Sequence, residues 1–308
     1  METNILAQTK MGIGTWSWGD RLYWGYGKGY QEEDIRRVFQ FCVQRGINFF
    51  DTAEVYGQGR SESYLGQFVR EMDKPIFLGT KFMPYPWRLS SKSLEKACKN
   101  SLQRLGMEKI SLYQIHMPLP PLSVESWMEG MIRVYEAGLV SHIGVSNYSM
   151  EQTQRAFTAL NREGIPLTSN QVEYHLLNRK IEKNGLLKMA KDLGVKIIAY
   201  SPIAMGALSG KYNEENLPSG YRSRRYNRQL FTRIRPLLLE MGRIGVIHDG
   251  KSVAQVAINW VMCKGAIPIP GAKTLEQAEQ NVESVSWTLT RDEVALLDDL
   301  SDRYAVEE

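Results

Sequence analysis

Residues 47–71 read INFFDTAEVYGQGRSESYLGQFVRE and contain one whole unit of the fold. The apolar run 47–50 has the length and composition of a buried strand. A turn rich in glycine and polar residues follows, and residues 61–71 then carry apolar side chains at helical spacing. The stretch therefore predicts a strand, a polar turn that carries Asp51 and Tyr56, and a helix that begins at Ser61 with Glu62 in its first turn.

The same unit recurs along the chain without a long linker between copies. Further apolar runs occupy residues 11–14, 76–79, 111–115, 142–145, 167–170, 196–199 and 266–269. Helical patterns occupy residues 31–45, 61–71, 90–105, 123–137, 149–163, 180–193, 251–264 and 274–283. Eight units in 308 residues average about 38 residues each, which suits parallel βα units.

Two α/β architectures contain such units: a closed (β/α)8 TIM barrel and a doubly wound open sheet. The open dinucleotide-binding sheet needs GxGxxG between its first strand and helix. Gly25, Gly27 and Gly29 give only GxGxG, inside an aromatic loop. We therefore predict one barrel domain over residues 1–308, with residues 2–10 plugging its floor and an extra helix over 289–300.

Composition excludes several classes of protein. Hydrophobic residues make up 43% and charged residues 23%, as in ordinary globular proteins. The sequence contains no run of 18 apolar residues, so no membrane-spanning helix is expected. The net charge of +4 argues against a nucleic-acid partner but suits a phosphate-bearing ligand. The four histidines form no HExxH motif, which argues against a metal. Three separated cysteines and no apolar leader predict a cytoplasmic protein.

Polar residues follow nearly every predicted strand. In a barrel, catalytic groups lie at the carboxyl ends of the strands. The residues there are Asp51, Thr80, Lys81, His116, Ser146, Asn147, Gln171, Tyr200, Ser201 and Lys273. A face used only for stability would not need this pattern, so we predict an active site at that end.

Four of these side chains form a chemically sensible set. A tyrosine has a pKa of about 10 and is a poor acid at neutral pH, but a lysine beside Tyr56 would lower that pKa. Lys81 can be that lysine, and Asp51 can supply the charge that a buried ammonium needs. His116 can hold a substrate oxygen near Tyr56. A tuned acid facing a carbonyl also needs a hydride source, and the sequence carries no flavin or metal signature, so a nicotinamide cofactor is expected.

Two glutamates close to this set have other expected roles. Glu54 lies two residues before Tyr56 and is expected to form hydrogen bonds within the loop. Glu62 is expected to stabilise the positive end of the following helix.

At this point the motifs resemble those of the aldo-keto reductases. The matching segments lie in family order at residues 48–62, 79–82, 112–116, 143–147, 200–202, 208–212 and 269–273. The resemblance implies a catalytic tetrad of Asp51, Tyr56, Lys81 and His116. It also implies the reduction of aldehydes or ketones by NADPH on a single barrel, with a small-molecule carbonyl as the partner and a monomer or weak oligomer.

The resemblance assigns the cofactor residues in groups. Gly14, Thr15 and Trp16 would line the site, Ser146, Asn147 and Gln171 would hold the carboxamide, and Tyr200 would stack on the nicotinamide. Ser201, Ile203, Gly206, Leu208 and Lys211 would wrap the diphosphate, and the last turn would add Gly271, Lys273, Gln277 and Asn281. Preference for NADPH over NADH depends mainly on Lys273, which is expected to face the 2′-phosphate.

Three questions stay open from the sequence. Aromatic residues Trp24, Tyr85 and Trp87, with Trp18 and Tyr26, either line a hydrophobic substrate pocket together with Tyr56 and His116 or simply pack. The loops most resemble a pyridoxal-reductase-like branch, while a cofactor-binding sensor or regulatory subunit, as among potassium-channel β subunits, is the alternative to an enzyme. Six arginines between Arg222 and Arg235 predict a solvated helix face, with Arg222 or Arg224 within reach of the phosphates.

Overall fold

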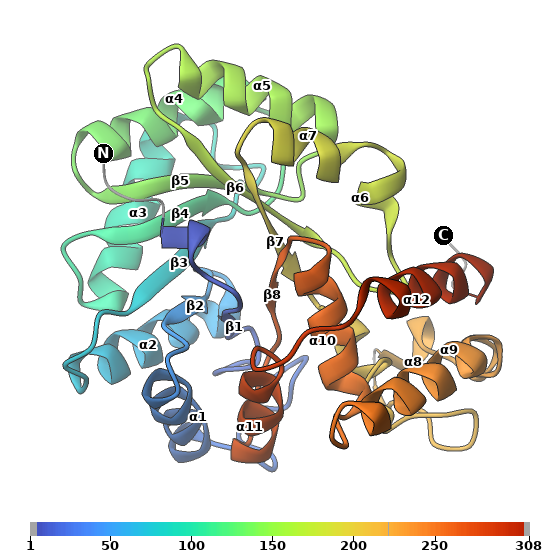
Figure 1. Cartoon of the computed structure of the whole chain (residues 1–308). Helices are drawn as coiled ribbons and strands as arrows, with labels where there is room; N and C mark the ends of the chain where they lie inside the picture. Colours follow the sequence, from blue (N-terminus) through green and yellow to red (C-terminus); the bar gives the residue numbers. More distant parts are fainter. Residues whose placement is uncertain (1–4, 221, 305–308) are drawn as a thin grey trace.

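The computed structural model describes residues 5–220 and 222–304 and shows eight parallel strands that pair in chain order (Figure 1). The first and last strands meet through a parallel bridge between Gly14 and Gly271, so the sheet closes. This confirms the predicted (β/α)8 barrel. The strands are β1 (Ile13–Gly14), β2 (Phe49–Asp51), β3 (Phe77–Phe82), β4 (Ile110–Ile115), β5 (Val140–Ser146), β6 (Leu167–Glu173), β7 (Lys196–Tyr200) and β8 (Ile267–Ile269).

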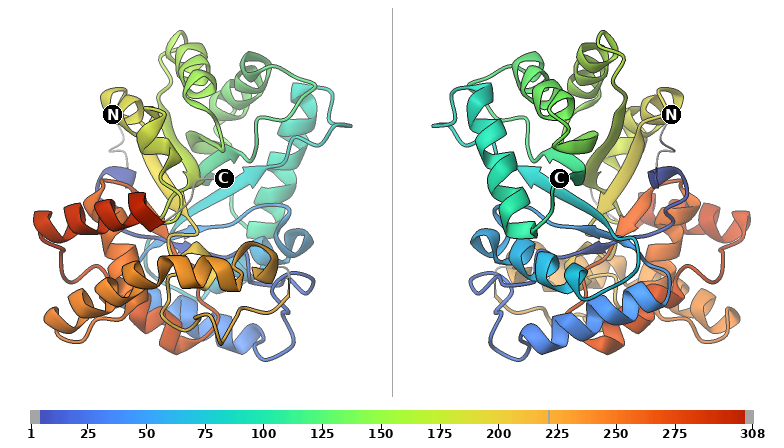
Figure 2. Two further views of the ribbon diagram at one scale, coloured as in Figure 1. Left: turned by 90° about the vertical axis from the view of Figure 1, so that its right-hand side faces the viewer. Right: turned by 90° about the vertical axis from the view of Figure 1, so that its left-hand side faces the viewer.

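Helices surround the strands on the outside (Figures 1 and 2). They are α1 (Glu32–Gln44), α2 (Arg60–Arg70), α3 (Ser91–Leu105), α4 (Val124–Glu136), α5 (Met150–Asn161), α6 (Lys180–Lys183), α7 (Leu186–Asp192), α8 (Arg222–Arg225), α9 (Arg228–Ile247), α10 (Val253–Cys263), α11 (Leu275–Glu283) and α12 (Arg291–Tyr304). Ser149 and Ser252 begin α5 and α10 with full capping boxes, and the Thr274 side chain caps α11. No helix in the described ranges has the length and hydrophobicity needed to cross a membrane.

Closure of the barrel depends on close backbone approach at Gly14. A Cβ atom at this position would lie 2.9 Å from the Ile269 carbonyl oxygen, so a larger residue would push β1 away from β8. With glycine there, the Gly14 amide donates to the Pro270 carbonyl at 3.1 Å.

An apolar cluster fills the floor of the barrel. Leu6, in the short 3₁₀ turn Ile5–Ala7, is 1% exposed and packs against side chains from five strands. These side chains are Phe49, Phe77, Leu112, Ile198, Ile267 and Ile269. The N-terminal segment therefore plugs the floor as predicted, although residues 2–4 lie outside the described residues. The polar side chains of the site lie above this layer.

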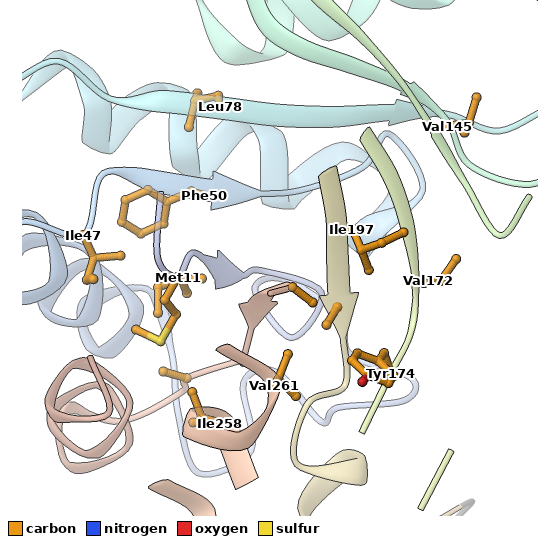
Figure 3. Packing of buried hydrophobic residues seen from close by; sticks show 14 of the residues in the cluster. Met11, Ile47, Phe50, Leu78, Val145, Val172, Tyr174, Ile197, Ile258 and Val261 are labelled. Atoms are coloured by element: carbon orange, nitrogen blue, oxygen red, sulfur yellow. The ribbon is translucent and has the colours of Figure 1, made fainter. Parts of the chain in front are cut away.

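A larger core separates the strands from the helices. Figure 3 shows part of it, with Phe50, Val172 and Ile197 on strands and Ile258 and Val261 on α10. Because both faces of the sheet are covered, the strands are apolar in near-continuous runs, as the sequence shows.

Several predicted boundaries are wrong. The helix expected over residues 180–193 is two helices, α6 and α7, separated at Gly185, whose φ is +83°. Strands β3, β5, β6 and β7 continue beyond their apolar runs, because polar residues that point into the site still pair with neighbouring strands. Helix α2 begins at Arg60 after Gly59, so Ser61 is inside it. Helix α9 belongs to no predicted unit, while α12 is the expected tail helix.

Candidate active site

Lys81 is the centre of the predicted tetrad. Its ammonium donates three hydrogen bonds: to Asp51 Oδ2 at 2.5 Å, to the Thr52 carbonyl at 2.8 Å and to Tyr56 Oη at 3.3 Å. Both charged side chains are buried, Lys81 completely and Asp51 to within 2%. All three N–H bonds of the ammonium are used, so its orientation is fixed and one N–H points at the phenol oxygen.

Charge and burial oppose each other in this cluster. Burial disfavours the ammonium, but Asp51 and Tyr56 outweigh it and hold the pKa of Lys81 above its usual value. Burial raises the pKa of Tyr56; Lys81 opposes this effect, and the charge on Asp51 adds to it. The net direction for Tyr56 is therefore upward, contrary to the predicted lowering, because desolvation exceeds the contribution of Lys81.

His116 lies beside Tyr56, with ring centroids 5.8 Å apart in a T-shaped arrangement. Burial and the neighbouring Lys81 charge lower the pKa of His116 to about 3. Its Nδ1 atom is buried and bonds to no other group in the described chain. His116 is therefore a neutral ring at physiological pH, and the protein leaves the hydrogen-bonding capacity of its Nδ1 atom unused among the described residues.

The residues assigned to the carboxamide form one hydrogen-bonded group. Ser146 Oγ donates to the Gln171 carbonyl at 2.9 Å, and Tyr200 Oη donates to Asn147 Oδ1 at 3.0 Å. Asn147 Nδ2 donates to the His116 carbonyl at 3.0 Å. The structure thus joins this group to the tetrad through the ends of β4 and β5.

A cation cluster of Lys211, Arg222 and Lys273 lies at the end of the site away from the tetrad. Lys273 Nζ lies 4.5 Å from the Trp24 ring centroid, and the Arg222 guanidinium lies 5.8 Å from the same ring. Burial, Arg222 and Lys211 lower the pKa of Lys273 to about 8, although Asp20 opposes them. No carboxylate of the described residues forms an ion pair with Lys211, Arg222 or Lys273. Unpaired cations held this close are suited to bind a phosphate.

The loop after β7 has an unusual backbone. Ser201, Ala204 and Met205 are non-glycine residues with φ between +48° and +52°. Such conformations are costly and concentrate at ligand sites. Leu208 is one of the residues assigned to the diphosphate, but its side chain is fully buried and faces the core. Ile203 is half-buried against the same core.

The loop after β1 carries a stack of aromatic rings next to Tyr56. The Trp16 ring stacks on Tyr23 at 4.8 Å and lies 6.1 Å from the Tyr56 ring. Trp24 contacts Trp16 edge-on at 5.5 Å. The aromatic surface therefore extends from the tetrad to the cation cluster.

Other aromatic residues have packing roles. Trp18 is fully buried, and its indole donates to the Ala272 carbonyl, while Tyr26 is 8% exposed and donates to Tyr64. The pocket interpretation is therefore wrong for these two. Tyr85 and Trp87 stack on each other with centroids 4.5 Å apart, but Trp87 is 72% exposed. Among the described residues, no ring contact joins this pair to Tyr56 or His116.

Three other assigned residues use their side chains internally. Thr15 Oγ1 donates to the Asp51 carbonyl at 2.9 Å. Asn281 Nδ2 donates to the Gly271 carbonyl at 3.3 Å, and Gln277 Oε1 accepts from the Lys273 amide at 2.8 Å. Thr15 and Asn281 are buried, so their side chains hold the walls of the site.

The arginines between Arg222 and Arg235 do not form one patch. Arg222 lies in the cation cluster and donates to the Met205 carbonyl at 3.2 Å. Arg225 forms a bidentate pair with Glu173, Arg233 donates to the Tyr304 carbonyl, and Arg235 pairs with Glu214. The helix-face interpretation is therefore too simple.

The two glutamates near the tetrad connect elements. Glu54 binds Arg88 and the Met83 amide, so it holds the loop after β3. Glu62 is fully buried in the first turn of α2, where it accepts from Thr80 and Arg104, each at 2.6 Å. The loop role expected of Glu54 is confirmed, and Glu62 does more than stabilise a helix end.

Gln114, which is not among the residues predicted for the site, donates to Asp51 Oδ1 at 3.3 Å. A signal was present, because Leu112, Gln114 and His116 alternate on the inward face of one strand, where an apolar residue is expected at the middle position. The bidentate partner of Glu173, Arg225, was also missed, and no local pattern connects two residues so far apart.

Comparison with known proteins agrees with this geometry. Residues 10–302 match the model of the Aldo/keto reductase family. Pyridoxal reductase, chloroplastic, from Arabidopsis thaliana is 39% identical over 301 residues, which cover 94% of this chain and 82% of that protein. A glycerol dehydrogenase from Gluconobacter oxydans superposes with a TM-score of 0.83 at 27% identity, covering 96% of this chain and 92% of that one.

A second solved relative contains a cofactor. The aldo/keto reductase from Klebsiella pneumoniae, in complex with NADP and acetate, has a TM-score of 0.75 at 25% identity and covers 97% of this chain and 92% of its own. The barrel, the contacts among Asp51, Lys81 and Tyr56, and these matches lead to one conclusion: the chain belongs to the aldo/keto reductase family.

Proposed function

We propose that this protein reduces aldehydes or ketones to alcohols with NADPH, and that Tyr56 donates the proton. The observation that carries the proposal is the chain of contacts from buried Asp51 through buried Lys81 to half-buried Tyr56, with neutral His116 beside it. These groups are arranged to place a proton donor and a hydrogen-bonding ring on one carbonyl oxygen.

Each residue has a separate task in this mechanism. When bound, NADPH supplies the hydride that reaches the carbonyl carbon. The raised pKa keeps the Tyr56 phenol protonated until its proton moves to the carbonyl oxygen. The Lys81 N–H that points at Tyr56 Oη stabilises the negative charge left on that oxygen, and Asp51 keeps the ammonium charged. His116 orients the carbonyl oxygen without competing as an acid.

The residues of the site fit this cofactor. The cluster of Lys211, Arg222 and Lys273 is suited to bind the phosphates, with Lys273 toward the 2′-phosphate. Ser146, Asn147 and Gln171 present amide and hydroxyl groups for a carboxamide, and the Tyr200 ring packs on the inner cluster of the barrel, where a flat ring can stack. NADH lacks the 2′-phosphate that would pair with Lys273.

We further propose pyridoxal as a substrate to test first. The support is the 39% identity to the Arabidopsis thaliana pyridoxal reductase. The Trp16 and Tyr23 rings beside Tyr56 provide an apolar surface on which a planar aromatic aldehyde can stack.

We also propose a cytoplasmic location and a monomer or weak oligomer. Cell fractionation tests the location, and light scattering tests the oligomeric state.

The test compares the wild type with Tyr56→Phe on a panel of aldehydes that includes pyridoxal, with NADPH and NADH. We expect Tyr56→Phe to lower kcat by about 10²- to 10⁴-fold, because a general acid contributes about that much, while NADPH affinity stays nearly unchanged. Full activity of the variant would contradict the mechanism. Tight NADPH binding with no oxidation by any carbonyl would instead favour the cofactor-binding sensor.

A further inference from the structure

Gln114 is a fully buried amide inside the barrel, one layer above the apolar floor. Its strand neighbours on the inward face are Leu112 below and His116 above. A leucine would fill this position as part of a continuous apolar interior. The amide instead lies against Asp51, so its presence needs a reason beyond packing.

Asp51 divides its two oxygens between different kinds of donor. Oδ2 accepts from Lys81, while Oδ1 accepts from Gln171 Nε2 at 2.8 Å and from Gln114 Nε2 at 3.3 Å. The two amides are also linked, because Gln171 Nε2 lies 3.5 Å from Gln114 Oε1. Two fixed donors on one oxygen prevent the carboxylate from rotating about its own bond.

The neighbouring strand makes room for this amide. Gly144 on β5 pairs with Gln114 in the sheet, and a Cβ there would lie 3.0 Å from Gln114 Cγ and 2.5 Å from Ser169 Oγ. An alanine at Gly144 would therefore displace the Gln114 side chain. The barrel is built to admit a long polar side chain at this point.

We propose that Gln114 is a positioning residue that, together with Gln171, locks the orientation of Asp51 so that Lys81 keeps one N–H on Tyr56. It touches neither the substrate nor the reacting atoms and acts through Asp51. Because Lys81 has only three N–H bonds, a rotated Asp51 carboxylate would draw the ammonium away from Tyr56 Oη. The inference builds on the proposed proton donation by Tyr56.

The first test is Gln114→Leu, which removes the amide and keeps an apolar side chain of similar size. We expect kcat to fall about tenfold, since one hydrogen bond to a charged group is lost, while the Kd for NADPH and the KM for the carbonyl stay near wild type. In a crystal structure of the cofactor-free variant, the distance from Lys81 Nζ to Tyr56 Oη should exceed its present 3.3 Å.

Ser169→Ala is the matched control. It deletes another buried polar group of the barrel interior, whose hydroxyl has no partner among the described residues, and it should keep wild-type kcat. Unchanged kcat in Gln114→Leu would overturn the inference, as would equal losses of kcat in both variants.

Gln114→Glu tests the role through the pH dependence of kcat, which would not change if Gln114 only filled space. The charged groups facing this position are Asp51 on β2 and Lys81 on β3, while Gly144 and Gln171 contribute no charge from β5 and β6. When two carboxyls are adjacent, the proton of one is held more tightly, and the Lys81 ammonium favours the ionised form of Asp51. The new glutamic acid is therefore the group that is protonated at low pH, and in that form it still donates to Asp51. Its kcat should be near wild type in acid and fall as pH rises, with an inflection that Gln114→Leu lacks.

A wild-type pH profile for Gln114→Glu would overturn the inference, even if Gln114→Leu fails to fold. The two proposals fail in different ways. If Tyr56→Phe stays active, the proposal that Tyr56 donates the proton is wrong. If Tyr56→Phe is inactive but Gln114→Leu is fully active, only the positioning role of Gln114 is wrong.

Discussion

At the scale of single residues, the charge state of Lys273 is set by its surroundings. Burial, Arg222 and Lys211 lower its pKa to about 8, so the free protein holds a mixture of ammonium and amine at mildly alkaline pH. A bound phosphate would favour the ammonium. Binding of a 2′-phosphate should therefore be accompanied by proton uptake near this pH.

We predict that NADPH affinity declines as pH rises through about 8, because the amine form of Lys273 cannot pair with the phosphate. NADH affinity should show no such decline. Lys273→Met should weaken NADPH binding by about tenfold or more and leave NADH binding nearly unchanged. Fluorescence titrations of both cofactors across this pH range measure the effect, and equal losses for NADPH and NADH would contradict it.

At the scale of elements, an ion pair connects the short helix α8 to the end of a barrel strand. Arg225 donates to Glu173 at 2.7 and 3.0 Å, and Glu173 ends β6. The same helix carries Arg222 of the cation cluster. In Figure 1, α8 lies beside α9. The ion pair therefore helps to hold Arg222, which also donates to the Met205 carbonyl.

Glu173→Gln should weaken the attachment of α8 and raise the Kd for NADPH about threefold to tenfold, with kcat at saturating cofactor nearly unchanged. The matched control is Glu125→Gln, which breaks a similar bidentate pair with Arg155 between α4 and α5. The control should bind NADPH like the wild type. If both variants bind NADPH equally well, α8 is held by other contacts.

At the scale of the whole molecule, the C-terminal helix α12 is attached through Asp298. Its carboxylate accepts from the Trp260 indole at 2.9 Å and from Lys264 at 2.8 Å, and its carbonyl accepts from Arg179 at 2.7 Å. These partners come from α10 and from the start of α6. The last helix thus fastens two neighbouring βα units from outside the barrel.

Asp298→Ala should lower the free energy of unfolding by about 2 kcal/mol, because two largely buried donors lose their acceptor. Asp299→Ala on the same helix removes only an exposed pair with Arg303 and should cost about 0.5 kcal/mol or less. Urea unfolding of both variants measures the difference. Equal effects would mean that α12 contributes little through Asp298.

The sequence alone determined the barrel and predicted the four groups of the proposed tetrad. Strand and helix periods are local properties, and the ends of parallel strands meet at one face, so the local pattern is enough to assign Asp51, Lys81 and His116 to that face. Boundaries were less accurate where polar residues stay within a strand, as at Lys81 and Gln171, because a hydrophobic run ends before the hydrogen-bonded ladder does.

Only the tertiary structure decided which of these groups touch. Gln114, Asp51 and Gln171 come from three strands and meet only when the barrel closes, and Arg225 reaches Glu173 across 52 positions of the chain. The direction of the Tyr56 pKa shift also depends on how far the folded chain excludes water. Local pattern places a residue on a face, whereas its partners and its dielectric surroundings are set by packing between segments distant in sequence.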